Sequence, residues 1–186
     1  MNLTPKQFEL FANVMYEPLS YIHSSYPTLA SKDDSLIWQK IANHELIKQY
    51  KLLPELDYST DDIVEKIVSS WHILPRCALF LGYFYSRNSL LLSENYYRLD
   101  KSLQAFLSLY PIVNINKDDD NQLQGIPALT IGYHLLFHFI SSISTALSQR
   151  FILLFDVEIS QITLPDSIGL SRSLFLLVLN YAALTA

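Results

Sequence analysis

Several residue types are scarce in this chain of 186 residues, and each scarcity excludes a kind of protein. Cys77 is the only cysteine, so an intrachain disulfide and a zinc site with several cysteine ligands are impossible. The four glycines are scattered, which excludes a glycine-rich loop that cradles a phosphate. Charged residues form only 17% of the sequence, below the usual share of about a quarter, while 50% of it is hydrophobic. The chain therefore has a large core, an exposed apolar docking surface, or contact with a membrane.

Basic residues are also too few for a typical nucleic-acid-binding protein. The formal net charge is −5, and no basic stripe is visible along the chain, so we expect no nucleic-acid partner. The same acidity disfavours binding to anionic membrane surfaces. The first residues, Met-Asn-Leu-Thr-Pro-Lys, lack the basic and apolar regions of a secretory signal. With the single cysteine, these features favour the cytosol.

Leucine, tyrosine and phenylalanine are abundant, and they recur with a helical period. A glycine-poor sequence rich in leucine and tyrosine favours helices over a turn-dense β fold. We expect a single compact all-α domain spanning residues 1–186, with about seven to eight helices. The expected helices cover residues 5–15 and 35–52, segments starting at 59–62 and at Pro75, and residues 88–98, 101–110, 127–149 and 167–184.

Two of these helices carry specific expectations about burial. For the helix of residues 35–52, Asp33 or Asp34 is expected to cap the first turn. Its apolar face is expected to hold Ile37, Ile41 and Tyr50. The last helix is apolar almost all round its circumference, a pattern typical of a buried helix.

Residues 121–149 raise the alternative of a membrane-associated subunit. The stretch contains no charged side chain, and a membrane-spanning helix needs roughly 20 mostly apolar residues. Polar residues nevertheless recur along it at helical spacing: His134, His138, Ser141, Thr145 and Ser148. Because lipid-facing helices rarely keep such a stripe, we interpret the stretch as a buried helix with a narrow polar edge. A membrane-associated subunit is the alternative.

Two histidine pairs resemble parts of metal-ligand patterns. His44 and the following glutamate begin a His-Glu-x-x-His motif, but Lys48 occupies the position of the second histidine. His134 and His138 lie one helical turn apart, yet a catalytic zinc needs a third protein ligand, and no carboxylate lies in that helix. We therefore expect no metal, no cofactor, no catalytic residue and no enzymatic activity. A small helical metal-binding protein using His134 and His138 is the second alternative.

A proline-centred motif lies near the start of the chain, where residues 15–23 read Met-Tyr-Glu-Pro-Leu-Ser-Tyr-Ile-His. Pro18 lacks a backbone N–H and suits the first turn of a new helix, and it biases Glu17 away from the helical region. The motif therefore predicts a helix that stops and restarts within an aromatic-rich packing element.

The motif at residues 15–23 resembles the opening motif of the OrgA/MxiK (SctK) family of bacterial type III secretion systems. Residues 70–82 resemble that family's Trp-x-x-Leu-Pro-x-x-Ala-x-x-Leu-Gly element, and residues 147–155 are similar to its Gln-Arg-Phe-x-Leu-Leu-Phe stretch. Residues 104–107 and 176–182 match two further segments in character. The shared order and spacing of these segments identify the chain as similar to that family.

The resemblance implies a non-enzymatic adaptor in the sorting platform of the secretion injectisome, a virulence machine that exports proteins. Family members link the SctQ-type pod protein to the cytosolic domain of the SctD-type inner-membrane ring protein. Through the pod they are connected indirectly to the SctL/SctN stator and ATPase. The implied location is the bacterial cytoplasm, at the cytoplasmic face of the inner membrane, with peripheral attachment through protein contacts.

Such an adaptor needs exposed contacts for its partners, and the polar members of the matched motifs are the candidates. These residues are Glu17, His23, Arg76 and Arg150. Glu17 and Arg150 also have a purely structural interpretation, in which they cap helix ends.

Overall fold

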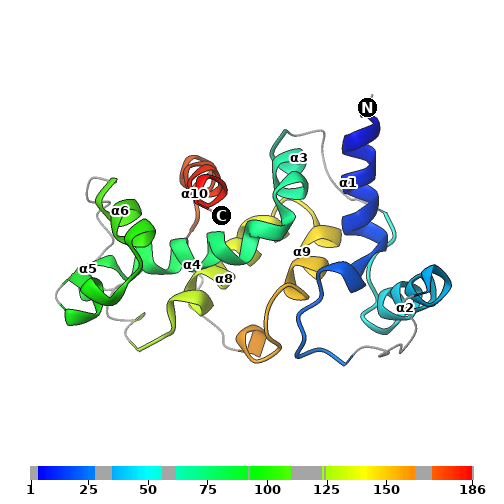
Figure 1. The fold of residues 1–186 in the computed structure, drawn as a ribbon, viewed down its shortest axis with the longest axis horizontal. Coiled ribbons are helices and arrows are strands. Elements are labelled where there is room, and N and C mark those ends of the chain that lie inside the picture. Colours follow the sequence, from blue (N-terminus) through cyan, green and yellow to red (C-terminus); the bar gives the residue numbers. More distant parts are fainter. Residues whose placement is uncertain are drawn as a thin grey trace. The chain divides into compact units, whose positions relative to one another are not determined.

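The structure is a computed structural model that describes residues 4–27, 35–55, 62–91, 93–109, 123, 125–161 and 169–185. Within these ranges every regular element is a helix, so the predicted all-α fold is confirmed (Figure 1). Nine α-helices are described there, eight of them with at least seven residues. They are α1 (Pro5–Tyr16), α2 (Leu36–Gln49), α3 (Asp62–Ser69), α4 (Leu74–Tyr85), α5 (Arg87–Leu91), α6 (Lys101–Leu109), α8 (Ala128–Ser141), α9 (Thr145–Ile152) and α10 (Arg172–Leu184). The 3-10 helices are η1 (Pro18–Ser20), η2 (Trp71–Ile73), η3 (Glu94–Arg98) and η4 (Ile159–Gln161).

The chain divides into two compact units, and each unit is assembled from two separate stretches of sequence. The first unit comprises Met1–His72 and Ile140–Gln161. The second comprises Ile73–Phe139 and Ile162–Ala186. The chain therefore passes from one unit to the other three times. The expectation of a single domain over residues 1–186 stays a prediction.

The first unit begins with a well-capped helix. The Thr4 hydroxyl oxygen accepts a hydrogen bond from the Gln7 N–H (3.3 Å), and the Gln7 side-chain oxygen accepts one from the Thr4 N–H (2.8 Å). This reciprocal pair satisfies two N–H groups that a helix start leaves open. The helix α1 ends at Tyr16, and Pro18 starts η1, as the proline-centred motif predicts.

Helix α1 packs against α2, α3 and α9, all within the first unit. The apolar side chains that α1, α3 and α9 bury are Phe11, Val14, Met15, Ile63, Val64, Ile67, Val68, Ala146, Leu147 and Phe151. A neighbouring cluster of Tyr26, Leu52 and Leu153 joins the end of α9 to the segments that follow η1 and α2. The Tyr26 hydroxyl donates a hydrogen bond to the Ile152 carbonyl oxygen (3.2 Å), so this aromatic ring is held at both its apolar and polar ends.

In the second unit, α4 and α8 cross at small residues. Gly82 lies against the backbone carbonyl of Ala128, and Gly132 lies against that of Ala78. A Cβ atom at either glycine would overlap the carbonyl group it faces. The reciprocal pairing of residues four apart on each helix means that α4 and α8 run antiparallel here at backbone-to-backbone distance.

An aromatic cluster packs α4 against α6 and α10 in the same unit. The ring centre of Phe106 lies 5.1 Å from that of Phe80 and 5.2 Å from that of Tyr181. The Tyr181 hydroxyl donates a hydrogen bond to the Ser102 carbonyl oxygen (3.0 Å). The cluster thus joins three helices that lie far apart in the sequence.

Two predicted helices are each divided in the structure. The predicted helix of residues 127–149 is α8 followed by α9, because the Ser144 hydroxyl oxygen accepts a hydrogen bond from the Leu147 N–H (3.2 Å) and caps a new helix. The prediction of one polar stripe from His134 to Ser148 along a single helix is therefore wrong. The predicted helix of residues 88–98 is α5 followed by η3.

Helix ends and burial also differ from expectation at two places. Ser35, rather than Asp33 or Asp34, caps α2 through a hydrogen bond from the Trp38 N–H (3.3 Å); those aspartates lie outside the described residues. So do residues 59–61 of the predicted start signal of α3, and residues 167–168 of the predicted last helix. Helix α10 buries one face and exposes Leu184, so its predicted burial all round is wrong.

Candidate functional site

Glu17 lies where the chain leaves α1 and enters η1. Its backbone angles (φ −122°, ψ 54°) are outside the helical region because Pro18 follows it. Its N–H donates a hydrogen bond to the Asn13 carbonyl oxygen, and its own carbonyl oxygen accepts one from the Ser20 N–H (both 3.0 Å). The exposed carboxylate therefore projects from a backbone that is fixed on both sides.

A groove with a volume of about 290 Å³ separates η1 from the first half of α2. It is lined by Glu17, Leu19, Ser20, Leu36, Gln39, Lys40 and Asn43. The Asn43 side-chain oxygen accepts a hydrogen bond from the Leu19 N–H (2.8 Å) and ties the two sides together. Aliphatic side chains thus line the same groove as one acidic and one basic group.

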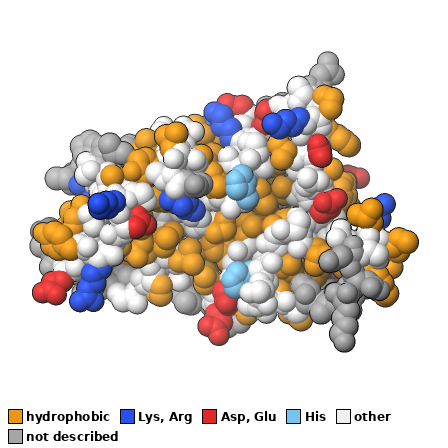
Figure 2. Space-filling model, in the orientation of Figure 1, with side chains coloured by type: hydrophobic (Ala, Val, Ile, Leu, Met, Phe, Trp, Pro, Cys, Tyr) orange, Lys and Arg blue, Asp and Glu red, His pale blue; other side chains and the backbone are white. Residues whose placement is uncertain are grey.

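Apolar side chains in the first half of α2 lie at the surface, where Figure 2 shows orange side chains at the right of the view. Leu36 is 74% exposed and Ile37 71%. Trp38 and Ile41 are also exposed, while Ala42 and Leu46 are buried. The prediction that Ile37 and Ile41 face inward is therefore wrong. Hydrophobic residues occur on more than one side of this helix, so periodicity could not identify the buried side.

His23 is half-buried at the end of the proline-centred motif. Its N–H donates a hydrogen bond to the Leu153 carbonyl oxygen (2.7 Å), which anchors the backbone. Its ring Nδ1 lies 2.9 Å from the Ser25 hydroxyl oxygen and 3.9 Å from a carboxylate oxygen of Asp156. His23 therefore has local partners, and its partly exposed ring stays a candidate for an external contact.

Arg150 is fully buried, which corrects the expectation of a surface contact. Its Nε and Nη2 donate to the Met15 carbonyl oxygen (3.2 and 2.9 Å), and its Nη1 donates to the Ala146 carbonyl oxygen (2.9 Å). Burial lowers the pKa of this guanidinium, but an arginine remains charged at neutral pH. The motif that contains Arg150 therefore corresponds to hydrogen bonds inside the protein, between α9 and α1, and not to a surface contact.

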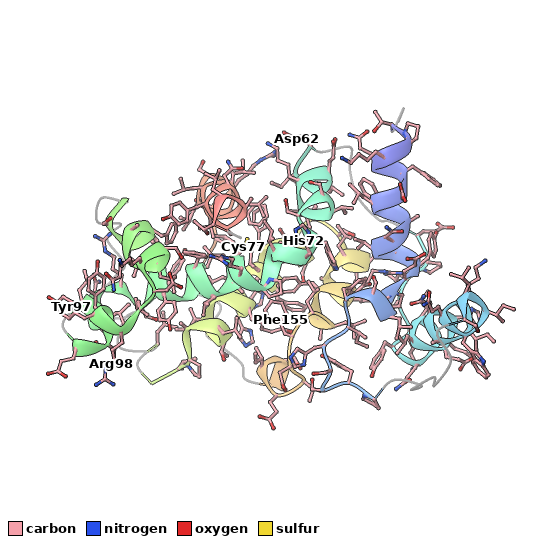
Figure 3. All side chains as sticks on the ribbon, viewed as in Figure 1. Asp62, His72, Cys77, Tyr97, Arg98 and Phe155 are labelled. Carbon is pink, nitrogen blue, oxygen red and sulfur yellow. The ribbon has the colours of Figure 1, made fainter. Side chains whose placement is uncertain are left out.

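Arg76 lies half-buried at the start of α4 in the second unit. Its guanidinium carbon is 5.6 Å from the ring centre of Phe80, a cation–π arrangement. A more exposed surface of this unit is formed by α5 and η3, where Leu91 is exposed and Tyr97 is 81% exposed. Figure 3 shows Tyr97 and Arg98 at the outer edge of η3. Sequence reasoning missed this surface because no motif marks it.

The two histidines of α8 differ in their exposure to solvent. His134 is buried and His138 is exposed, with ring centres 6.5 Å apart. Among the described residues, no group of three or more His, Cys, Asp or Glu could hold a metal ion. Cys77 is also buried, and burial raises the pKa of its thiol to about 12, so it is protonated at neutral pH.

No helix in the described part of the chain is long and apolar enough to span a membrane. The helical fold carries exposed apolar side chains beside charged ones on α2 and on the α5–η3 segment. Such surfaces are typical of proteins that bind other proteins. The described chain is thus a helical protein with surfaces suited to protein contacts.

A family model described as "Bacterial type III secretion apparatus protein (OrgA_MxiK)" matches residues 11–184. The chain therefore belongs to this family and is a component of the type III secretion apparatus. Membership in this family implies protein partners and a structural rather than an enzymatic role. No curated protein and no solved structure matched the chain.

Proposed function

We propose that this protein is an adaptor of the sorting platform, which links the SctQ-type pod protein to the cytosolic domain of the SctD-type inner-membrane ring protein. The observation that carries the proposal is the family match over residues 11–184. Through the pod, the adaptor is connected indirectly to the SctL/SctN stator and ATPase. It works in the bacterial cytoplasm and reaches the inner membrane only through protein contacts.

The distribution of exposed side chains supports a role with two partners. The first unit exposes apolar side chains on α2, and the second exposes Leu91 and Tyr97 on the α5–η3 segment. An adaptor that binds two proteins at once needs two such surfaces, and aromatic anchors with a polar surround are typical of them. Glu17 and His23 belong to the first unit, and Arg76 belongs to the second. These three residues are the proposed polar contacts with the partners.

The proposal is tested by co-expressing the full chain with each partner from the same secretion system, separately and together. We expect co-purification with the pod protein, with the ring protein's cytosolic domain, and with both in one complex. Because peripheral charges contribute little to affinity, Glu17→Gln and His23→Ala should weaken binding only a few-fold. A chain that is helical by circular dichroism and binds neither partner would contradict the proposal.

A further inference from the structure

We propose that the outward face of α2 and the adjoining groove bind an amphipathic helix of a partner protein, with apolar anchors at one end and acidic side chains at the other. This inference rests on the proposed function, because the partner is one of the two proteins that the adaptor links. The groove, the exposed apolar residues and the charges of α2 each support it.

The outward face of α2 has an apolar half and a basic half. Ile37 and Ile41 are one turn apart, and His44 and Lys48 continue the same stripe along the next two turns. All four side chains are exposed. The helix therefore presents aliphatic groups near its first turn, and an imidazole and an ammonium group towards its last.

The apolar half has the composition of a binding site. Leu36 and Trp38 flank Ile37, and the groove beside η1 begins at Leu36. Four large exposed apolar side chains within six consecutive residues are unusual on a chain surface, and tryptophan is among the residues that dominate binding energies. A helix laid along α2 could insert side chains into the groove, as in other helix-in-groove complexes.

The basic half determines the charge of the occupant. Lys48 lies in this half, and Lys40 lines the groove beside the apolar half. The one acid of α2 is Glu45, although the whole chain has a net charge of −5. By helical geometry Glu45 lies to one side of the stripe and Lys40 to the other, each by about 70° round the axis. Acidic side chains on the partner would therefore meet lysines.

A second copy of the chain fits this face poorly. If two α2 helices paired in parallel about a twofold axis, Lys48 would meet Lys48. If they paired antiparallel, the apolar residues Ile37 and Ile41 of one copy would lie against the basic half of the other. A membrane is also disfavoured, because anionic lipids repel an acidic protein and only the first two turns of α2 expose apolar side chains.

The test compares four variants of the full chain for binding to the purified pod protein and, separately, to the purified ring-protein cytosolic domain. Ile37→Ser with Ile41→Ser removes the apolar half, and Lys40→Glu with Lys48→Glu reverses the charge. Leu184→Ser and Lys101→Glu are matched controls at exposed positions of the second unit. Calorimetry gives affinities, and hydrogen exchange reports on residues 36–49.

We expect the double serine variant to weaken binding to one of the two partners by about tenfold or more, and to leave the other unchanged. The charge-reversal variant should weaken the same partner, with a difference that shrinks as salt is added. The controls should bind as the parent chain does, and the bound partner should slow exchange in α2. All of the substituted side chains are exposed, so circular dichroism should be unchanged.

Three outcomes would overturn the inference while leaving the proposed function intact. Both double variants could bind both partners like the parent, loss of the apolar half could abolish self-association in light scattering, or the parent could bind phosphatidylcholine–phosphatidylserine vesicles through this face. If the folded parent chain binds neither partner, the proposed function itself fails, and the inference fails with it.

Discussion

The two units of this chain differ in what lies at the closest approach of their helices. In the first unit, the buried guanidinium of Arg150 joins α9 to the end of α1. In the second unit, α4 and α8 meet at Gly82 and Gly132 with no side chain between their backbones. The first unit depends on the presence of one long charged side chain, whereas the second depends on the absence of any.

Helix α1 explains how the first unit tolerates a buried charge. Met15 lies in the last turn of α1. Backbone carbonyl oxygens there have no N–H donor within the helix, and the helix dipole places partial negative charge at this end. Arg150 supplies donors to that carbonyl and so satisfies both the acceptor and its own charge. The stability of the first unit should therefore be sensitive to the loss of a side chain, and that of the second unit to the addition of one.

The largest effect is expected from Gly132→Leu, which adds a side chain to the glycine crossing. The new Cβ would overlap backbone atoms of Ala78, which cannot rotate away, so α4 and α8 must separate. We expect a loss of about 3 kcal/mol in the free energy of unfolding, measured with urea. Gly169→Leu is the matched control, because no described atom beyond its chain neighbours lies within 4 Å of a Cβ at that position. Equal stabilities of these two variants would contradict the close crossing.

Arg150→Met should have the next largest effect, because it leaves the Met15 carbonyl oxygen buried without its donors. The expected loss is about 2 kcal/mol in the free energy of unfolding, measured in the same way. Arg150→Lys should restore little of it, since one ammonium group does not reproduce the planar set of donors. The exposed Arg98→Met is the control. The interpretation of Arg150 fails if the Arg150→Met and Arg98→Met variants are equally stable.

Hydrogen exchange on the same two variants measures whether the two units open separately or together. If each unit opens separately, Gly132→Leu should speed exchange in α4 and α8, and Arg150→Met should speed it in α1 and α9. If exchange speeds up everywhere in both variants, the units unfold together. That second result would support the prediction of one domain over residues 1–186.

The smallest effect is expected at Asp100, which caps α6 in the second unit. Its carboxylate accepts hydrogen bonds from the Ser102 hydroxyl (2.5 Å) and the Leu103 N–H (2.9 Å), and these bonds lower the pKa of Asp100. Asp100→Ala should therefore cost about 1 kcal/mol at neutral pH. A lowered folded-state pKa means that the stabilisation is complete above the unfolded pKa of about 3.9 and is lost as the pH falls through the folded value.

Urea unfolding of the parent and Asp100→Ala at pH 7 and in mildly to strongly acidic buffers measures this dependence. The stability difference between the two proteins should shrink on the acidic side. A difference that grows as the pH falls would show that the carboxylate is not the favoured form in the folded state.

The sequence motifs that resemble the family lie at internal packing contacts rather than at the surface. Residues 15–23 and 147–155 meet in the first unit through Arg150 and through the bond from the His23 N–H to the Leu153 carbonyl oxygen. In the second unit, the segments of residues 104–107 and 176–182 meet at the contact of Phe106 with Tyr181. The segments that resemble the family thus lie where helices contact one another. For this reason a polar residue of a matched segment, such as Arg150, is internal and was wrongly predicted to lie at the surface.

Local chemistry explains which sequence predictions about elements were right. Pro18 ends α1 and Pro75 lies in the first turn of α4, because each effect depends only on adjacent backbone groups. Burial could not be predicted in the same way. Ile37 and Ile41 have the period of a core face, yet the packing of α2 through Ala42 and Leu46 turned them outward.

The all-α class, most helix starts and the resemblance to the family could therefore be read from the sequence, since these follow from backbone chemistry and from the order of motifs. Tertiary structure alone decided that Arg150 is internal, that α4 and α8 touch at glycines, and that α2 exposes Leu36, Ile37, Trp38 and Ile41. The physical reason is that burial depends on which neighbour occupies each face of a helix. Contacts between segments distant in the chain supply those neighbours, and helical periodicity does not encode them.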